Sequence, residues 1–234
     1  MAITKKPILS IIIPTLNESA NLPSTLISIP KIPSNEVIVV DGGSRDETLL
    51  LAAEYGARVI HSPRGRAVQM NHGAAQAQGE LLLFLHADTK LPEGFMGPLL
   101  QILSRTGVSA GAFQLKLHPP LPGLEVIERL ANWRARVWQR PYGDQGLFLR
   151  KDRFRAIGGF PEIPMMEDIE LIRRLRRQGR IVIVPLPVVS SSRRWQESGV
   201  LKTTLRNQMA LLGYGIGISP DQLARWYHKN KKGS

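Results

Sequence analysis

Blocks of apolar and polar residues alternate over residues 8–90. Short runs rich in β-branched residues predict buried strands at 9–13, 36–40, 58–60 and 81–85. The mixed segments between them predict helices at 19–29, 44–55 and 66–78. Ser44 and Glu47 have the spacing of a capping box for the second helix. This strand–helix alternation indicates an α/β protein, with a mostly parallel central sheet flanked by helices.

The pattern is less regular after residue 90. Helices are expected at 94–104, 124–138, 167–178, 200–212 and 220–228. Strands are expected at 109–117 and 181–184, and a loop at 143–146 precedes the apolar residues 147–149. No linker divides the chain cleanly, so we expect one domain over residues 1–234.

Polar side chains follow several of the predicted strands. Asn17 and Glu18 follow the first strand, Asp41 the second, and His86 and Asp88 the fourth. The carboxyl ends of parallel strands meet at one edge of a sheet, and ligands bind beyond that edge. We therefore expect a binding site there.

Asp41 and the pair His86 and Asp88 each allow two interpretations. Asp41 precedes two glycines and a helix start, so its carboxylate could accept a hydrogen bond from a nucleobase beside a phosphate at the helix terminus. An acidic strand-to-helix turn explains it equally. His86 and Asp88 would point the same way in extended chain, and could hold a cation that bridges a diphosphate. Alternatively, Asp88 caps the next segment.

Further candidates lie in the second half. Glu167 and Asp168 begin a predicted helix, where a carboxylate could act as a general base or simply suit the helix dipole. Arg66 could contact phosphate or ribose. The segment 193–195, Arg-Arg-Trp, could hold a diphosphate and line an acceptor site, or be a basic loop with one core aromatic. The glycine-bounded loop 142–146 is a weaker candidate.

Composition narrows the class of protein. The formal net charge is +12, which favours anionic partners such as acidic membranes or phosphorylated molecules. No cysteine is present, so disulfides and thiol chemistry are excluded. No charge-free segment reaches spanning length, and we expect a soluble or peripheral protein. The basic amphipathic segment 124–140 could lie on a membrane, or form a core helix. Only the net charge would favour nucleic acid, so we expect no nucleic-acid partner.

Taken together, five segments resemble the inverting family-two glycosyltransferases of the GT-A fold. They are residues 10–18, 36–46, 65–71, 83–88 and 166–171, which occur in the family's order and spacing. The His-Ala-Asp, Tyr-Gly-Asp-Gln-Gly and Arg-Arg-Trp variants look like a bacterial subgroup labelled as arsenosugar-biosynthesis or carotenoid-acid glycosyltransferases.

The resemblance implies a sugar transfer from a nucleoside-diphosphate sugar, usually UDP-linked, to an acceptor hydroxyl with inversion. It implies a nucleotide-binding half at 8–90, an acceptor and catalytic half at 91–195, and a helical appendage at 196–234. The acceptor would be a lipid or small molecule, and the protein cytoplasmic or peripheral at the inner face of the membrane. The implied site residues are Pro14, Asn17, Glu18, Asp41, Arg66 and Ala87 for the nucleotide, Asp88 and His86 for Mn²⁺ or Mg²⁺, Asp168 or Glu167 as base, and Arg194 and Trp195 for diphosphate and acceptor.

Two departures from the family pattern matter. His86 stands where relatives have the first acid of Asp-x-Asp, so it either ligates the metal or orients Asp88 through a hydrogen bond. Ser191 stands where processive relatives have the glutamine of Gln-x-x-Arg-Trp, which argues against polymer synthesis. The rival enzyme is a sugar nucleotidylyltransferase, which would need a glycine-rich basic loop after the first strand. The rival of another class is an inactive nucleotide- or membrane-binding protein.

Overall fold

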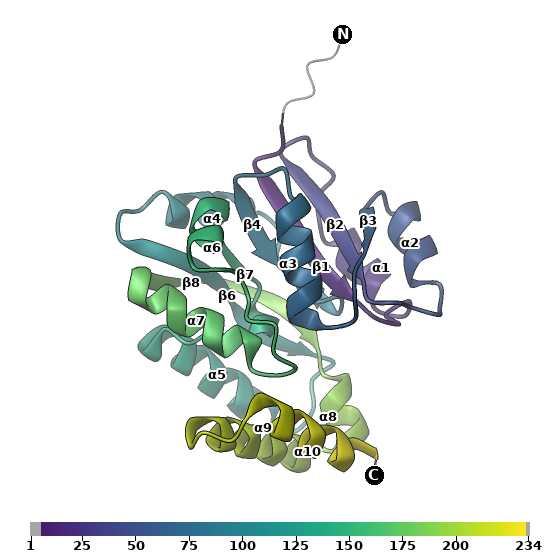
Figure 1. The fold of residues 1–234 in the computed structure, drawn as a ribbon, viewed down its shortest axis with the longest axis vertical. Coiled ribbons are helices and arrows are strands. Elements are labelled where there is room, and N and C mark those ends of the chain that lie inside the picture. The colour runs from purple at the N-terminus through teal and green to yellow at the C-terminus, as the bar shows by residue number, and fades with distance from the viewer. Residues whose placement is uncertain (1–5, 233–234) are drawn as a thin grey trace.

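The computed structural model describes residues 6–232, whose strands form one eight-stranded sheet (Figure 1). The elements follow one another as β1 (Leu9–Thr15), α1 (Leu22–Ile27), β2 (Asn35–Asp41), α2 (Thr48–Glu54), β3 (Arg58–His61), α3 (Arg66–Gln76), β4 (Leu81–Phe84), β5 (Thr89–Lys90), α4 (Met96–Leu103), β6 (Val108–His118), α5 (Leu124–Trp138), η1 (Gly143–Gln145), β7 (Leu147–Arg150), α6 (Lys151–Ala156), α7 (Glu167–Gln178), β8 (Arg180–Ser191), α8 (Arg193–Ser198), α9 (Val200–Gly215) and α10 (Pro220–Lys232).

The sheet has the strand order β3-β2-β1-β4-β7-β6-β8-β5. The first four strands in that order are parallel, which confirms the α/β alternation expected for residues 8–90. β7 is antiparallel to both of its neighbours, and β6 and β8 are parallel to each other. The carboxyl ends of β1, β2 and β4 therefore lie together at one edge, where the polar residues were expected to gather.

Helices cover both faces of the sheet, because alternate side chains of each strand point to opposite faces. Ile11 and Ile13 of β1 pack into a cluster with α1, α2 and α4, whereas Ile12 packs with α3, α6 and α7. All three isoleucines are fully buried. β1 is therefore apolar along its whole length and carries its chemistry only beyond its end.

Several predicted boundaries were wrong. The predicted capping box is absent: α2 begins at Thr48, and the Ser44 hydroxyl donates to the Asp41 carboxylate instead. The strand expected at 181–184 extends to Ser191 as β8, because its partner β6 is equally long. β1 includes Pro14, which is tolerated because β1 has only β2 beside it beyond Ile12.

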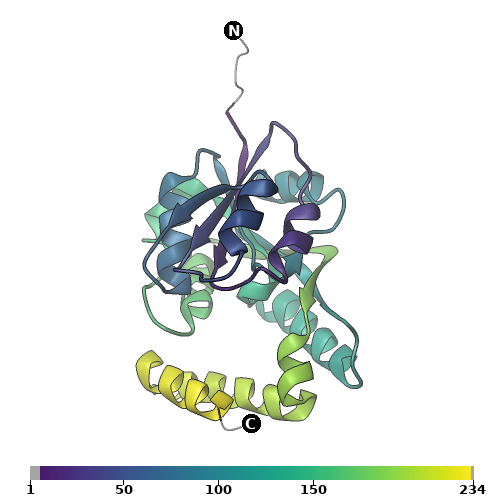
Figure 2. The same ribbon diagram turned by 90° about the vertical axis from the view of Figure 1, so that its right-hand side faces the viewer.

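The chain after β8 forms three helices beside the sheet rather than on it (Figures 1 and 2). The segment 193–195, interpreted above as a loop, is the first turn of α8, a helix that the sequence pattern did not predict. α9 and α10 pack on each other and on the loop before α7 through Met166, Ala210 and Leu223. No helix within residues 6–232 is long and apolar enough to cross a membrane.

Candidate functional site

The loops after β1 and β2 are joined by hydrogen bonds. The Asn17 backbone N–H donates to the Ser44 hydroxyl (2.9 Å), and the Arg45 N–H donates to the Asn17 side-chain oxygen (2.8 Å). Asn17 has a φ of 54°, a left-handed conformation that asparagine tolerates better than most residues. The Gln69 side chain of α3 donates to the carbonyls of Thr15 and Val40, so α3 fixes both strand ends.

Asp41 is buried, and its carboxylate is engaged within its own turn. It accepts hydrogen bonds from the backbone N–H groups of Gly43 (2.8 Å) and Ser44 (3.0 Å). The Ser44 hydroxyl donates to it at 2.5 Å, and the Thr15 hydroxyl at 3.4 Å. These bonds occupy the acceptor positions of one carboxylate. A nucleobase that pairs with Asp41 must therefore displace one of them.

A chain of charges connects β1 to β4. Arg193 of α8 donates to both carboxylate oxygens of Glu18, and its Nη2 atom lies 3.5 Å from the Asp88 carboxylate. Burial raises the pKa of Asp88, while the guanidinium groups of Arg193 and Arg194 act in the opposite direction. Arg193 had no separate role in the sequence interpretation. Its neighbour Arg194 is equally basic, so only the fold distinguishes the two.

His86 lies against the loop 142–146 and lines the same cavity as Asp88. Its Nε2 atom lies 3.0 Å from where a Cβ on Gly143 would be. Burial lowers the pKa of His86 well below its usual value, and Arg66 and Arg194 lower it further. The imidazole is therefore neutral at pH 7 and has a lone pair. Within the described residues no hydrogen bond joins it to Asp88, so it does not orient that carboxylate.

Glu167 and Asp168 are adjacent on α7 but have different neighbours. Glu167 is buried and forms an ion pair with Arg66 of α3. That pair raises the pKa of Arg66 although burial, the largest single influence, lowers it. Asp168 accepts a hydrogen bond from the Gly143 N–H (2.9 Å) through Oδ2 and borders the main cavity. Glu167 is thus already neutralised by Arg66, and of these two adjacent acids only Asp168 borders the main cavity.

Asp144 is a cavity residue that the sequence interpretation did not single out. Its Oδ1 atom is buried and has no hydrogen-bond partner among the described residues. Burial raises the pKa of its carboxyl group, although nearby Arg134 lowers it. Arg134 itself lies over the Tyr142 ring, 3.4 Å from the centroid. The sequence signals for this loop were its two glycines and the Tyr-Gly-Asp-Gln-Gly variant, and neither assigned a role to Asp144.

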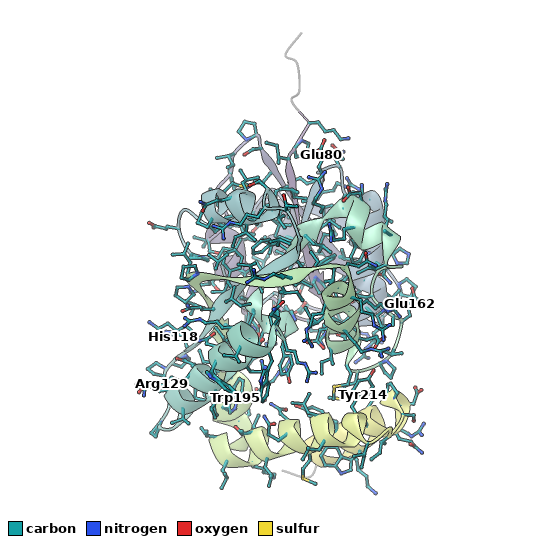
Figure 3. The ribbon with its side chains drawn as sticks, turned by 90° about the vertical axis from the view of Figure 1, so that its left-hand side faces the viewer. Glu80, His118, Arg129, Glu162, Trp195 and Tyr214 are labelled. Atoms are coloured by element: carbon teal, nitrogen blue, oxygen red, sulfur yellow. The ribbon has the colours of Figure 1, made fainter. Side chains whose placement is uncertain are left out.

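Six of the predicted site residues line one cavity of about 220 Å³, which we call the main cavity. They are Arg66, His86, Asp88, Asp168, Arg194 and Trp195. Trp195 also packs on a small apolar cluster that includes Leu117, and its indole N–H donates to Thr204. Figure 3 shows Trp195 on the side of the central body that faces α9.

The remaining predicted residues lie outside the main cavity. Pro14, Asn17, Glu18 and Asp41 lie at the ends of β1 and β2. The side chain of Ala87 is buried in the core, and its carbonyl accepts a hydrogen bond from Thr25. Two acidic residues outside the main cavity are linked to it by ion pairs: Glu18 through Arg193 to Asp88, and Glu167 to Arg66.

The close packing of Gly143 between His86 and Asp168 can be tested by substitution. A Cβ at this position would lie 3.0 Å from His86 Nε2 and 3.4 Å from Asp168 Oδ2. We expect Gly143→Ala to lower kcat/KM by roughly 10- to 100-fold, because small displacements of reacting groups are costly. The loss of stability should be only about 1 kcal/mol. Gly97→Ala is the control: nothing lies within 4 Å of its Cβ position. Equal activity of the two variants would contradict this arrangement.

Comparison with known proteins identifies the family. The eight-stranded mixed sheet with helices on both faces has the GT-A fold, as the family match and the similar solved structures show. Glucosyl-3-phosphoglycerate synthase of Mycobacterium tuberculosis, in complex with Mn²⁺, UDP and glucosyl-3-phosphoglycerate, has a TM-score of 0.64 at 22% identity and covers 91% of this chain and 81% of its own. Residues 10–151 match Glycosyl transferase family 2, and the chain belongs to that family.

Other similar proteins have related names. A mannosyltransferase of Pyrobaculum calidifontis, in complex with GDP-Man and Mn²⁺, has a TM-score of 0.65 at 20% identity, covering 80% of this chain and 57% of its own. A PGL/p-HBAD biosynthesis glycosyltransferase of Mycobacterium tuberculosis is 36% identical over an alignment of 173 residues, and the match covers 66% of this chain and 63% of that protein. The match thus spans less than two thirds of that relative's length.

Proposed function

We propose that this protein transfers a sugar from a nucleoside-diphosphate sugar, UDP-linked by preference, to an acceptor hydroxyl with inversion at the anomeric carbon. The observation that carries the proposal is the main cavity, where Asp88 and His86 from the end of β4 and Asp168 from α7 occur together. The main cavity thus combines a site for a donor diphosphate with a carboxylate, Asp168, that the acceptor can reach. Family membership supports the same reaction class.

The nucleotide would lie along the ends of β1 and β2. Asn17, Ser44 and Asp41 form the floor there, held in place by Gln69. Relatives of the same fold support a nucleotide donor, since their structures contain UDP or GDP-Man. Uracil recognition by Asp41 would replace one of its internal hydrogen bonds. Arg194 and Arg66 would face the diphosphate from the other side of the main cavity.

Asp88, with the neutral His86, would hold a divalent cation beside the donor diphosphate. Within the described residues no three His, Cys, Asp or Glu side chains gather to hold a metal. A cation that binds here would take one or two ligands from Asp88 and the neutral His86, and the rest from phosphate and water. Mn²⁺ suits this oxygen and imidazole set better than Mg²⁺. When bound, it supplies positive charge that stabilises the departing diphosphate.

Asp168 would act as the general base. Its carboxylate takes the proton of the acceptor hydroxyl as the acceptor oxygen forms a bond to the anomeric carbon. The bond from that carbon to the diphosphate oxygen breaks in the same step, and the electron pair leaves with the nucleoside diphosphate. The Gly143 N–H holds Oδ2 in place. A single displacement of this kind inverts the anomeric configuration.

A panel of nucleotide sugars tests the donor class. Slow hydrolysis should release a nucleoside diphosphate from one or a few donors, with UDP-sugars preferred, since water can replace the acceptor. Release should require Mn²⁺ or Mg²⁺ and should stop on addition of a chelator. Release of pyrophosphate from a nucleoside triphosphate and a sugar phosphate would favour the rival nucleotidylyltransferase instead.

Two exposed helix faces support contact with an anionic membrane. On α5 the side chains of Leu130 and Trp133 are 60% and 50% exposed, and those of Leu201 in α9 and Ile216 directly after it are 82% and 81% exposed. Other residues of both helices line the main cavity. Arg129 points outward from α5 beside its apolar residues (Figure 3). Exposed apolar side chains bordered by arginines fit the surface of an anionic bilayer.

Vesicle flotation tests this surface. The double variant Leu130→Gln, Trp133→Gln should bind vesicles of phosphatidylcholine and phosphatidylglycerol more than about tenfold less than the wild type, because buried apolar area drives insertion. Leu50→Gln, which removes an exposed leucine from α2, is the control. Unchanged vesicle binding by the double variant, or a dimer in solution that the same substitutions disperse, would contradict the membrane role.

A further inference from the structure

A second cavity of about 220 Å³ adjoins the main cavity on the side of α9 and α10. Arg66 and Arg194 line both cavities, whereas Arg206 of α9 lines only the second. Asp88 and His86 line only the first. The two spaces therefore share two arginines but differ in the groups that could hold a metal and a donor diphosphate. We call the second space the Arg206 cavity.

Arg206 is buried without partners for two of its nitrogen atoms. The residue is only 7% exposed, and the Nε and Nη1 atoms of its side chain have no hydrogen-bond partner in the described part of the chain. The guanidinium carbon lies 4.6 Å from the centroid of the Tyr227 ring, so the ring covers one face of the group. A buried guanidinium without acceptors destabilises a fold. An anion that enters the cavity would supply those acceptors.

The charges around the Arg206 cavity favour an anion with more than one negative charge. Three guanidinium groups line it, and Glu197 is the one acidic side chain among its lining residues. Arg66 is neutralised by Glu167, but Arg194 is exposed and has no ion pair within the described residues. Two positive charges thus remain against that of Glu197. The planar fork of arginine matches the oxygen atoms of a phosphate group, which can accept from several donors at once.

We propose that the Arg206 cavity binds a phosphate group of the acceptor. This inference rests on the proposed function, since Arg66 and Arg194 connect the cavity to the space that contains Asp168. A phosphate held by Arg206 would anchor the acceptor while its hydroxyl reaches Asp168. The donor diphosphate would stay beside Asp88, which does not line the Arg206 cavity. The phosphate can belong to a soluble phosphate ester or to a lipid headgroup.

Titration of glycerol 3-phosphate into protein saturated with UDP and Mg²⁺ tests the proposal. The wild type should bind it saturably, and Arg206→Met should bind it at least about tenfold more weakly, because charge-assisted hydrogen bonds are lost. Without ligand, Arg206→Met should melt at or above the wild-type temperature, since it removes an unpaired buried charge. Arg225→Met, an exposed arginine on α10, is the control for net charge. Arg206→Lys keeps the charge without the fork and should bind with intermediate affinity.

Phosphatidate vesicles, compared with phosphatidylcholine vesicles, separate the two sources. Binding to phosphatidate alone that Arg206→Met abolishes assigns a lipid phosphate, and binding to glycerol 3-phosphate assigns a soluble one. Unchanged binding of both probes by Arg206→Met and Arg206→Lys, or no binding by the wild type, overturns the proposal. Binding of glycerol 3-phosphate only to protein without UDP also overturns it, by assigning Arg206 to the donor. A wild type that binds glycerol 3-phosphate but no nucleotide contradicts the proposed transferase and not the anion site.

Discussion

Asp168→Asn is expected to lower the rate of sugar transfer by about 10²- to 10⁴-fold and to leave nucleotide affinity unchanged. The size of the effect is that of a positioned general base. The substitution keeps the shape of the side chain, and an amide oxygen can still accept from the Gly143 N–H that holds Oδ2. The fold and the donor site should therefore persist while proton removal fails. Single-turnover transfer and UDP titration on the same preparation measure the two properties separately.

Asp152→Asn is a matched control for that experiment. Asp152 is the second residue of α6, as Asp168 is the second residue of α7, and it lies outside the main cavity. Any effect of removing a negative charge from a helix start appears in both variants. Loss of transfer in Asp168→Asn alone identifies the base. Full turnover by Asp168→Asn would transfer that role to another carboxylate, with Asp144 the next candidate.

Asp88→Asn is expected to remove the metal-dependent part of nucleotide binding. A carboxylate that shares a cation with a diphosphate contributes affinity only when the cation is present. Loss of even an outer-shell partner of a metal ligand typically weakens metal binding by about 10- to 100-fold, and loss of a ligand should cost at least as much. In the wild type, Mn²⁺ should strengthen UDP binding. In the variant, the affinity for UDP should be the same with and without Mn²⁺.

His86→Gln completes the comparison at the end of β4. His86 is neutral and forms no hydrogen bond with Asp88 within residues 6–232. If its imidazole is a second ligand, His86→Gln should weaken the Mn²⁺ effect less than Asp88→Asn does. A metal effect that persists at full size in Asp88→Asn would contradict the assignment of the cation to this strand end.

The first half of the fold could be predicted from the sequence because its signal is local. Ile11, Ile12 and Ile13 form an uninterrupted apolar run, and such a run is required of a strand buried on both faces. The polar residues that follow these strands meet at one edge because the carboxyl ends of parallel strands lie at the same edge of a sheet. The second half depends on long-range pairing. β8 extends to Ser191 because it pairs with β6 along its length, and no local sequence pattern predicts that length.

Six of the predicted site residues line one cavity, but the contacts that each side chain makes could not be predicted from the sequence. Glu167 and Asp168 are adjacent acids, and only the fold turns one toward Arg66 and the other toward Gly143. Arg193 and Arg194 are likewise adjacent and identical, and only the fold places one beside Glu18 and the other in the main cavity. Arg206 is one arginine within a helical segment, and its burial depends on Tyr227 from the following helix. Which direction a helical side chain faces is set by packing that the sequence pattern does not contain.

Calorimetric titration of UDP into the full chain, with and without Mn²⁺, tests the central claim most directly. The account predicts saturable binding that Mn²⁺ strengthens, and that strengthening should disappear in Asp88→Asn while persisting in Asp168→Asn. In parallel titrations, GDP and ADP should bind more weakly than UDP if Asp41 and Asn17 favour uracil. Absence of binding to any nucleoside diphosphate, with or without metal, would contradict the proposal that this protein uses a nucleotide-sugar donor.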